Sequence, residues 1–252
     1  MYKYLIRTKT ANPLFWFSQE YFYFRNLKEI IKDGIVYVID EDGVCLFCPF
    51  NFVINSFAVF DNIDFVWASS NSIDFDSNWE KNFLDEEFFY NPLDFLNLSG
   101  KKWKTFRKNI NKWMDKDYDY FDISGMDNYR KEKETLILKW SEDLEEFYDA
   151  DILIKFCFFG NNVKGLFYKD KLIAINIWDE NKKYINFRYN IVDRENSFIS
   201  EFSRYLFYID PVILKSNKLV NDGGWLGKET LRKFKIKLNP IAIRKIYSFK
   251  RK

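Results

Sequence analysis

The strongest constraint on the fold comes from three apolar segments that follow one another closely in the second half of the chain. Residues 164–168, 172–178 and 184–191 are apolar over lengths typical of β-strands, and short turns at 169–170 and 179–181 separate them. Strands joined by such short connections pair antiparallel with their neighbours, because a parallel pair needs a long crossover. The sequence therefore predicts a three-stranded meander around which the other elements must be arranged.

Helical patterns lie on both sides of this meander. Residues 128–148 and 197–209 place apolar side chains at helical spacing, and Pro211 ends the second segment. A basic helix is expected after Gly227, and residues 241–249 alternate as a final strand. Helix, antiparallel meander, helix, loop, helix and strand are the element order of an acetyltransferase-type α+β domain.

The start of the chain has a similar but weaker pattern. Residues 14–32 show mostly helical spacing. Residues 35–39 and 44–47 flank an Asp-Glu-Asp-Gly turn and should form a hairpin, and residues 51–60 and 63–68 alternate like further strands. These elements suggest a degraded copy of the same kind of domain.

Two polar stretches separate these elements from the rest. Residues 69–97 are acidic and are expected to form a loop with a short helix, and residues 115–127 are the best candidate for a linker. We therefore expect an α+β fold of two tandem acetyltransferase-like (GNAT) domains, mostly antiparallel mixed sheets flanked by helices, at residues 1–120 and 121–252. No repeat at the level of sequence links the two halves, so the duplication rests on element order.

Composition excludes several classes of function. The 252 residues include 39 basic and 37 acidic side chains, so any basic site must be local. Histidine is absent, which removes Ser-His and Cys-His nucleophiles and nearly all zinc catalysis. Proton transfer must then use carboxylates, Tyr, Lys, water or the substrate itself. The aromatic content of 21% fits an A+T-rich genome, and a base-stacking surface is the other reading.

The chain is expected to be cytoplasmic. No apolar run approaches the roughly 20 residues of a membrane span, and charge interrupts the short apolar run at the start. Three cysteines are an odd count, which fits reduced thiols. Cys45 and Cys48 lie on an expected strand and would face opposite ways, so no metal site is predicted.

The first candidate site is a basic helix at residues 98–113. Ser99 is expected to cap it, and its inward stripe has spacings of three and four: Trp103, Phe106, Ile110 and Trp113. The outward bases are Lys101, Lys102, Lys104, Arg107, Lys108 and Lys112, of which the first five are the candidate phosphate- or tRNA-binding residues. Phosphates of a nucleotide, a coenzyme or tRNA are natural partners for such a cluster near a helix N-terminus. A solvated charged face is the equally simple alternative.

The second candidate site is the glycine-rich loop and the basic helix that follows it. The residues expected to contact substrate are Asn221, Gly223, Gly224, Trp225, Arg232 and Phe234. Lys235 falls four residues after Leu231 and borders the apolar stripe, where its ammonium could stabilise an oxyanion during acyl transfer. Asp222 is a candidate proton carrier. Lys235 could instead be a surface lysine whose stem lies along the stripe.

Two segments resemble a known family. Residues 98–110 are similar to a Gly-Lys-Lys-aromatic…Arg-Asn-x-Ile pattern, although Lys108 separates Arg107 from Asn109. Residues 221–240 are similar to Asn-x-x…Gly-x-x-x-Leu-Arg-x-x-Lys…Pro. Both patterns occur in the soluble C-terminal domain of phosphatidylglycerol lysyltransferases, which resembles the peptidoglycan peptide-bridge aminoacyltransferases. This resemblance implies a tandem of two GNAT-fold domains.

The resemblance also implies an activity. Phe234 and Lys235 match the Phe-Lys pair that places a lysine near the acyl carbonyl in the peptide-bridge enzymes, so Lys235 would stabilise the oxyanion. Residues 190–197 lack the glycines of the usual acetyl-coenzyme A loop, which favours an aminoacyl-tRNA donor or a loss of activity. The expected function is acyl transfer from aminoacyl-tRNA to an amine or hydroxyl. The alternatives are an acyl-CoA-dependent N-acyltransferase and a non-catalytic module that binds nucleic acid or protein.

Overall fold

The computed structural model describes residues 18–32, 35–39, 44–46, 65–69, 79–125, 127–141 and 150–252. The helices are α1 (Gln19–Phe24), α2 (Lys104–Met114), α3 (Arg130–Ser141), α4 (Ala150–Phe159), α5 (Ile199–Tyr208), α6 (Pro211–Ser216) and α7 (Glu229–Lys237). Short 3-10 helices are η2 (Pro92–Phe95), η3 (Lys101–Trp103) and η4 (Asp127–Tyr129). The strands are β1 (Lys28–Lys32), β2 (Ile35–Ile39), β3 (Val44–Leu46), β4 (Phe65–Ser69), β5 (Trp79–Tyr90), β6 (Tyr118–Asp122), β7 (Val163–Tyr168), β8 (Lys171–Glu180), β9 (Tyr184–Val192), β10 (Leu219–Asn221) and β11 (Ala242–Arg251).

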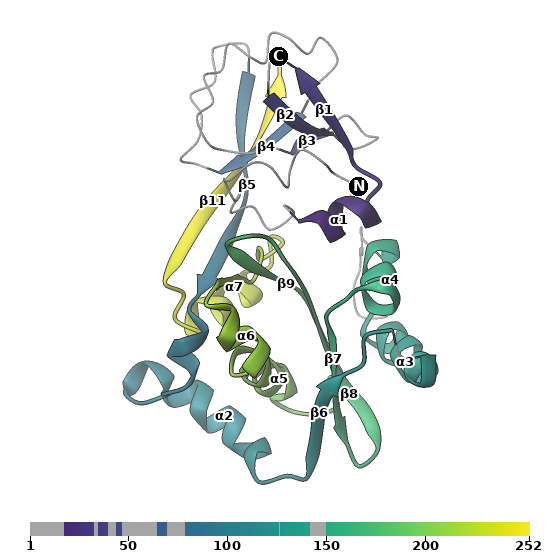
Figure 1. Cartoon of the computed structure of the whole chain (residues 1–252). Helices are drawn as coiled ribbons and strands as arrows, with labels where there is room; N and C mark the ends of the chain where they lie inside the picture. The colour runs from purple at the N-terminus through teal and green to yellow at the C-terminus, as the bar shows by residue number, and fades with distance from the viewer. Residues whose placement is uncertain are drawn as a thin grey trace.

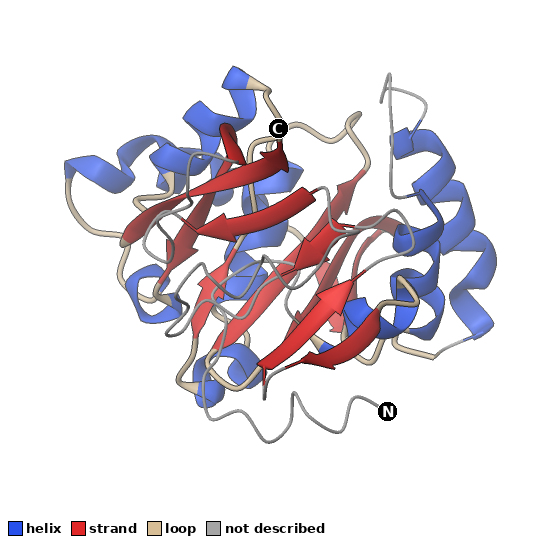
Figure 2. Cartoon of the chain, turned by 90° about the horizontal axis from the view of Figure 1, so that it is seen from above, coloured by secondary structure: helices blue, strands red, loops and turns tan. Residues whose placement is uncertain are grey.

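The described strands form one sheet of 11, in the order β1-β2-β3-β4-β11-β5-β10-β9-β8-β7-β6. Neighbours are antiparallel except for the pairs β3–β4 and β9–β10, which are parallel. The long strands β5 and β11 pair with each other and join the two ends of the molecule (Figure 1). Viewed from above, the strands lie between two groups of helices (Figure 2).

Helices cover both faces of the sheet around β8. The helices α5, α6 and α7 lie on one side of it and α3 and α4 on the other (Figure 1). Strand β8 is buried at every position between its two terminal residues, which is the pattern of a strand packed on both faces. One apolar cluster joins α2 and α5 to the sheet, and the other joins α1, α3 and α4 to it.

The predicted meander is confirmed as β7, β8 and β9. Strand β8 pairs antiparallel with β7 on one side and with β9 on the other. The expected helices before and after it are α3 and α5, the basic helix after Gly227 is α7, and the final strand is β11. The hairpin is confirmed as the antiparallel pair β2–β3. The expected strand at residues 51–60 lies outside the described residues.

The acidic stretch at residues 69–97 was predicted wrongly. Instead of a loop with a short helix, it contains the 12-residue strand β5, followed by η2. Acidic residues disfavour strands in general, yet here three consecutive acids are buried because partners from β10, from the loop after it and from α7 bind them. Tertiary contacts therefore override the local preference.

Three smaller expectations were also wrong. The helix at residues 14–32 is limited to α1, and the chain then turns into β1. The linker candidate at 115–127 contains β6, which pairs with β7. Ser99 does not cap the basic helix, because Gly100 precedes η3 with φ of 84° and α2 begins only at Lys104 without a side-chain cap.

The sheet continues across both halves of the chain. Strand β5 from the first half pairs with β10 and β11 from the second half. Residue 120 lies inside β6, so the proposed boundary between residues 1–120 and 121–252 falls within a strand. The division into two domains stays a prediction.

Candidate functional site

The site is built where two parallel strands separate. The pairing of β9 with β10 ends at Asn186 and Asn221, while β9 continues to Val192. The chain leaves β10 through residues 222–228 and enters α7. Strand β5 holds this loop: the amide of Asp222 donates to the Phe88 carbonyl at 2.9 Å.

Lys235 points into the protein. It is 3% exposed, and its ammonium donates to the backbone oxygen of Asp222 and lies 3.5 Å from that residue's Oδ1. The hydroxyl of Tyr90 donates to the Lys235 carbonyl at 2.8 Å. Burial lowers the pKa of Lys235, and the nearby Asp222 carboxylate opposes that shift. The alternative of a surface lysine is therefore excluded.

Asp222 lies between two cations. Its Oδ2 forms an ion pair with Arg204 of α5 and accepts the hydroxyl of Tyr208 at 3.4 Å. The Arg204 guanidinium lies 5.0 Å from the Phe187 ring and 5.4 Å from the Phe234 ring. Burial, with Asp222 as the second cause, raises the pKa of Tyr208 well above its usual value. These buried residues form what we call the Lys235 cluster: Tyr90, Arg204, Tyr208, Asp222 and Lys235.

The acids of β5 are the part of the site that the sequence did not reveal. Asp85 accepts the amides of Trp225 at 3.0 Å and Leu226 at 3.1 Å. Further along the strand, Glu86 pairs with Arg232 at 2.7 Å and Glu87 accepts the Asn221 amide at 2.9 Å. The strand-forming run Phe88-Phe89-Tyr90 was the signal that could have identified this strand.

The position of the Asp85 carboxylate requires a glycine at residue 224. A Cβ at residue 224 would lie 1.9 Å from Asp85 Oδ2, so a side chain there would displace the carboxylate that holds the loop. Gly223 and Gly227 have positive φ values of 63° and 69°. These glycines shape the loop itself, and contact with a substrate stays a prediction for Gly223 and Gly224.

Two buried donors of the site have no hydrogen-bond partner within the described part of the chain. They are Trp225 Nε1, in the loop between β10 and α7, and Arg204 Nε, on α5. Buried polar groups are nearly always satisfied, so unpaired donors beside a loop are positions where a bound group could accept. Trp225 was predicted to contact substrate, whereas Arg204 was not identified from the sequence.

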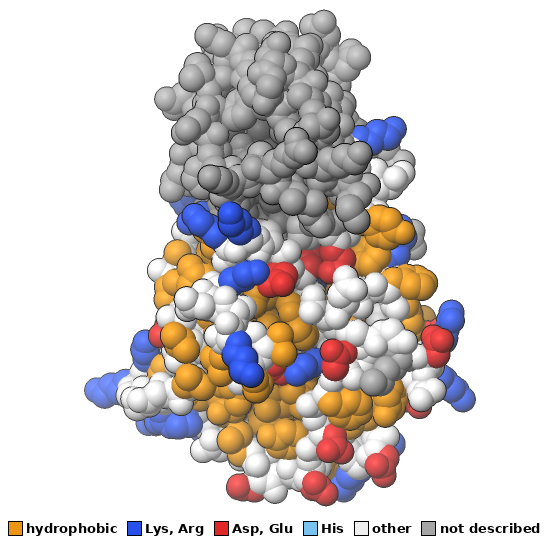
Figure 3. All heavy atoms as spheres, viewed as in Figure 1, with side chains coloured by type: hydrophobic (Ala, Val, Ile, Leu, Met, Phe, Trp, Pro, Cys, Tyr) orange, Lys and Arg blue, Asp and Glu red, His pale blue; other side chains and the backbone are white. Residues whose placement is uncertain are grey.

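The bases of η3 and α2 lie apart from the Lys235 cluster. Lys101, Lys102, Lys104 and Lys108 are exposed, whereas Arg107 is half-buried and donates to the Leu98 carbonyl. Lys and Arg side chains gather at the lower left of Figure 3, over α2. The predicted inward stripe is confirmed: Trp103, Phe106, Ile110 and Trp113 are buried.

Helix α5 stands between α2 and the cluster. Trp113 Nε1 donates to the Ser197 carbonyl at 2.9 Å, and Asn109 donates to Glu201 at 3.1 Å. Arg204 of the same helix reaches Asp222. In the described structure, no contact joins the α2 bases to Lys235.

The turn between β9 and α5 is held by contacts within the protein. Asp193 and Glu195 each lie 2.9 Å from the ammonium of Lys139. Asp193 also accepts the amide of Glu195 at 3.2 Å. The amide of Asp193 donates to the Ile173 carbonyl at 2.8 Å and that of Asn196 to the Asp193 carbonyl at 3.0 Å, so this turn lacks the free amides with which an acetyl-coenzyme A loop binds pyrophosphate.

Three solved structures share this fold. A conserved protein of unknown function from Bacteroides thetaiotaomicron has a TM-score of 0.71 and 17% identity, over 92% of this chain and 88% of that one. L-PGS from Bacillus licheniformis has a TM-score of 0.67 and 17% identity, over 91% and 85%. The C-terminal domain of a proposed lysylphosphatidylglycerol synthetase from Agrobacterium fabrum has a TM-score of 0.62 and 15% identity, over 93% and 87%.

The class that follows from the fold and these likenesses is an α+β protein with the fold of L-PGS and of the lysylphosphatidylglycerol synthetase C-terminal domain. No family model and no curated protein matches the chain. None of the described helices has the length and hydrophobicity that a membrane crossing requires. Across the described residues, no three Cys, Asp or Glu side chains come together as a metal-ligand set.

Proposed function

We propose that the chain is an acyltransferase that moves an aminoacyl group from aminoacyl-tRNA to an amine or hydroxyl acceptor. The observation that carries the proposal is the buried ammonium of Lys235, fixed beside the point where β9 and β10 separate. The fold shared with L-PGS supports the class of reaction, and we also propose the tandem arrangement of two GNAT-like domains on that basis. We also propose that the reaction takes place in the cytoplasm, where charged tRNA is found.

The chemistry is a direct transfer. The acceptor's nitrogen or oxygen attacks the ester carbonyl, the bond to the tRNA ribose oxygen breaks, and the acceptor's proton ends on that oxygen. An ammonium has three N–H donors. Two of those of Lys235 point to Asp222, which leaves a third for the oxyanion of the tetrahedral intermediate.

Asp222 then acts as a positioning residue. Its carboxylate is shared by Arg204 and Lys235, and removing a proton from the acceptor would disrupt these pairs. We therefore assign the proton transfer to the hydroxyl of the tRNA ribose. The unpaired donors Trp225 Nε1 and Arg204 Nε are proposed to orient the aminoacyl group.

The donor is proposed to be tRNA rather than coenzyme A. At the β9–α5 turn the amides of Asp193, Glu195 and Asn196 already donate to acceptors within the protein, so they are not free to bind a pyrophosphate. The exposed lysines of α2 offer a place for the tRNA backbone on the far side of α5, where a long substrate could span both regions.

The test is a transfer assay with total tRNA charged with labelled amino acids, together with an extract of small molecules and lipids as acceptors. We expect label to leave the tRNA and to appear on an amine or hydroxyl compound, in a reaction that needs the protein. A parallel reaction with labelled acyl-CoA should give no transfer. Transfer from acyl-CoA alone would replace the donor, and tRNA binding without transfer from either donor would indicate a binding module.

A further inference from the structure

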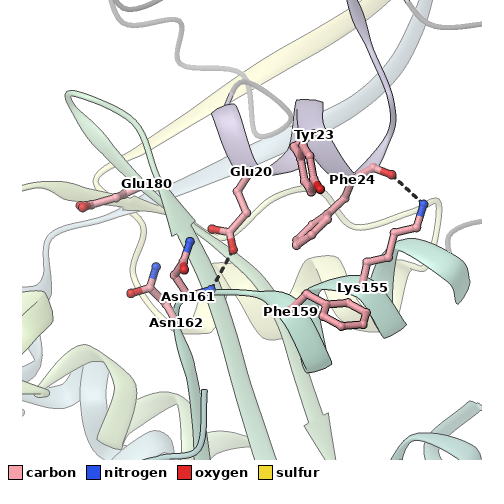
Figure 4. A pocket seen from close by; sticks show the side chains of 8 residues that line it. All are labelled: Glu20, Tyr23, Phe24, Lys155, Phe159, Asn161, Asn162 and Glu180. Atoms are coloured by element: carbon pink, nitrogen blue, oxygen red, sulfur yellow. Dashed lines mark hydrogen bonds between the residues drawn. The ribbon is translucent and has the colours of Figure 1, made fainter. Parts of the chain in front are cut away.

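A pocket of about 1000 Å³ opens on the side of the sheet that α1 and α4 cover, across the sheet from the Lys235 cluster. Its size is that of a small-molecule site. Figure 4 shows the lining side chains, which come from α1, α4, the turn after α4 and the end of β8: Glu20, Tyr23, Phe24, Lys155, Phe159, Asn161, Asn162 and Glu180.

Two of the three charged side chains in this pocket already have partners of their own. The Lys155 ammonium donates to the Phe24 carbonyl at 2.8 Å, at the end of α1 (Figure 4). Glu180 forms an ion pair with Lys218 at 2.6 Å. Lys218 therefore compensates Glu180, and the Lys155 ammonium is held by a neutral carbonyl at the end of α1.

Glu20 is the exception. Its Oε1 accepts one backbone amide, from Asn161 at 2.8 Å, and no ion pair to it is found in the described part of the chain. Burial raises the pKa of Glu20 to about 7, against the effect of that amide; Asp179 adds to the shift and Arg188 opposes it. Ionisation of this carboxyl is therefore unfavourable unless a cation binds beside it.

The walls beside Glu20 are aromatic. Tyr23 and Phe159 are each 73% exposed, and Phe24 is buried beneath them against Phe156. Single exposed aromatics are common on surfaces. Two of them in the lining of one pocket, beside a carboxyl without a counterion, offer apolar area and ring faces that attract cations.

We propose that this pocket binds a small molecule carrying a protonated amine on an aliphatic or aromatic body. The ammonium lies at Glu20, and the body packs against Tyr23 and Phe159. The side chains of Asn161 and Asn162 add hydrogen-bonding groups near the ammonium. The site is separate from acyl transfer at Lys235, and it stands whether or not that activity is found.

The geometry gives the binding a pH dependence. The groups that face Glu20 are Asp179 and Arg188, which form a fixed pair at 2.8 Å, and the committed side chains Lys155 and Glu180. Only ionised Glu20 pairs with the ammonium. Because its pKa is about 7, the affinity should rise about tenfold between about pH 6 and 8, with release of a proton below pH 7.

The experiment is calorimetry on the whole chain without tRNA, with 2-phenylethylamine as the probe. We expect it to bind at least about tenfold more tightly than the neutral 2-phenylethanol, and 3-phenylpropanoate not to bind. Glu20→Gln keeps an oxygen for the Asn161 amide and should weaken amine binding about tenfold or more, to the level of the alcohol. The matched control Glu180→Gln, already neutralised by Lys218, should change it less than about twofold.

Three results would overturn the proposal: equal binding of amine and alcohol, amine binding that survives Glu20→Gln, or no saturation by the amine below about 10 mM. If Glu20→Gln does not fold, Phe159→Ala provides the second test, because its exposed ring can be removed without opening the core. That variant should bind the amine about threefold or more weakly, and unchanged affinity would contradict the proposal.

Discussion

The Lys235 cluster and the Glu20 pocket solve the same physical problem in different ways. Each places an ionisable group away from water, which is unfavourable unless the charge is compensated. In the cluster, a carboxylate lies between two cations, so opposite charges compensate one another. In the pocket, Glu20 has one amide and a raised pKa instead of a counterion. The cluster should therefore be rigid, and the pocket should respond to pH and to ligands.

The largest expected effect comes from breaking the cluster. Asp222→Ala leaves Lys235 and Arg204 buried without their shared carboxylate, and should lower the free energy of unfolding by about 3–5 kcal/mol. Urea denaturation measures this loss. Removal of an exposed acid such as Glu229, by Glu229→Ala, should change stability by less than about 0.5 kcal/mol. An Asp222→Ala loss below about 1 kcal/mol would show that the cluster is not held by this carboxylate.

The loop of the cluster should be sensitive to one added methyl group. Gly224→Ala forces Asp85 away from the amides of Trp225 and Leu226, at a cost of about 2 kcal/mol or more. Gly227→Ala is the matched control, because nothing lies near its Cβ and only its φ of 69° is unfavourable, at about 1 kcal/mol. Thermal unfolding compares the two. Equal losses would mean that Asp85 adjusts freely.

The pocket should appear in the pH dependence of stability. The folded state raises the pKa of Glu20 to about 7 from 4.5, so it binds the proton more tightly than the unfolded chain. This contribution is present below about pH 4.5 and is lost as the pH rises through 7. Relative to Glu20→Gln, the wild-type protein should lose about 1–2 kcal/mol across that range, allowing for partial exposure. Parallel pH profiles of the two proteins would contradict the shift.

The smallest effect on stability is expected in α2. Replacing Lys104 and Lys108 with alanine removes exposed charges and should change unfolding by less than about 0.5 kcal/mol each. The same double variant should weaken tRNA binding. It should also reduce the slope of the logarithm of the binding constant against the logarithm of the salt concentration by roughly one to two. Unaltered salt dependence would mean that this helix is a solvated face.

Local patterns were sufficient for much of the fold. The meander β7–β9, the stripe of α2 and the helices around residues 130–141 and 199–208 follow from short-range periodicity, which each segment carries within itself. In strand β5 only the last three residues, Phe88-Phe89-Tyr90, carry such a local signal. Its acids Asp85, Glu86 and Glu87 are compatible with a buried strand only because of partners more than 130 positions away.

The candidate site was predicted in the same partial way. The sequence placed Lys235 at the border of an apolar stripe. The structure buries it against Asp222, whose carboxylate compensates the charge of the buried ammonium. It gave no reason to choose Arg204, because an arginine in a helix of mixed composition looks like a surface residue. Nor did it identify Glu20, whose character depends on α4 and β8 packing around it.

The most direct test of the account is single-turnover transfer from aminoacyl-tRNA by Lys235→Met, with Lys233→Met as control. Met keeps the length of the buried stem, and Lys233 is an exposed base on the same helix. We predict that Lys235→Met transfers at least about 100-fold more slowly, with tRNA affinity within about threefold of wild type, while Lys233→Met is unaffected. Full-rate transfer by a folded Lys235→Met protein would contradict the central claim.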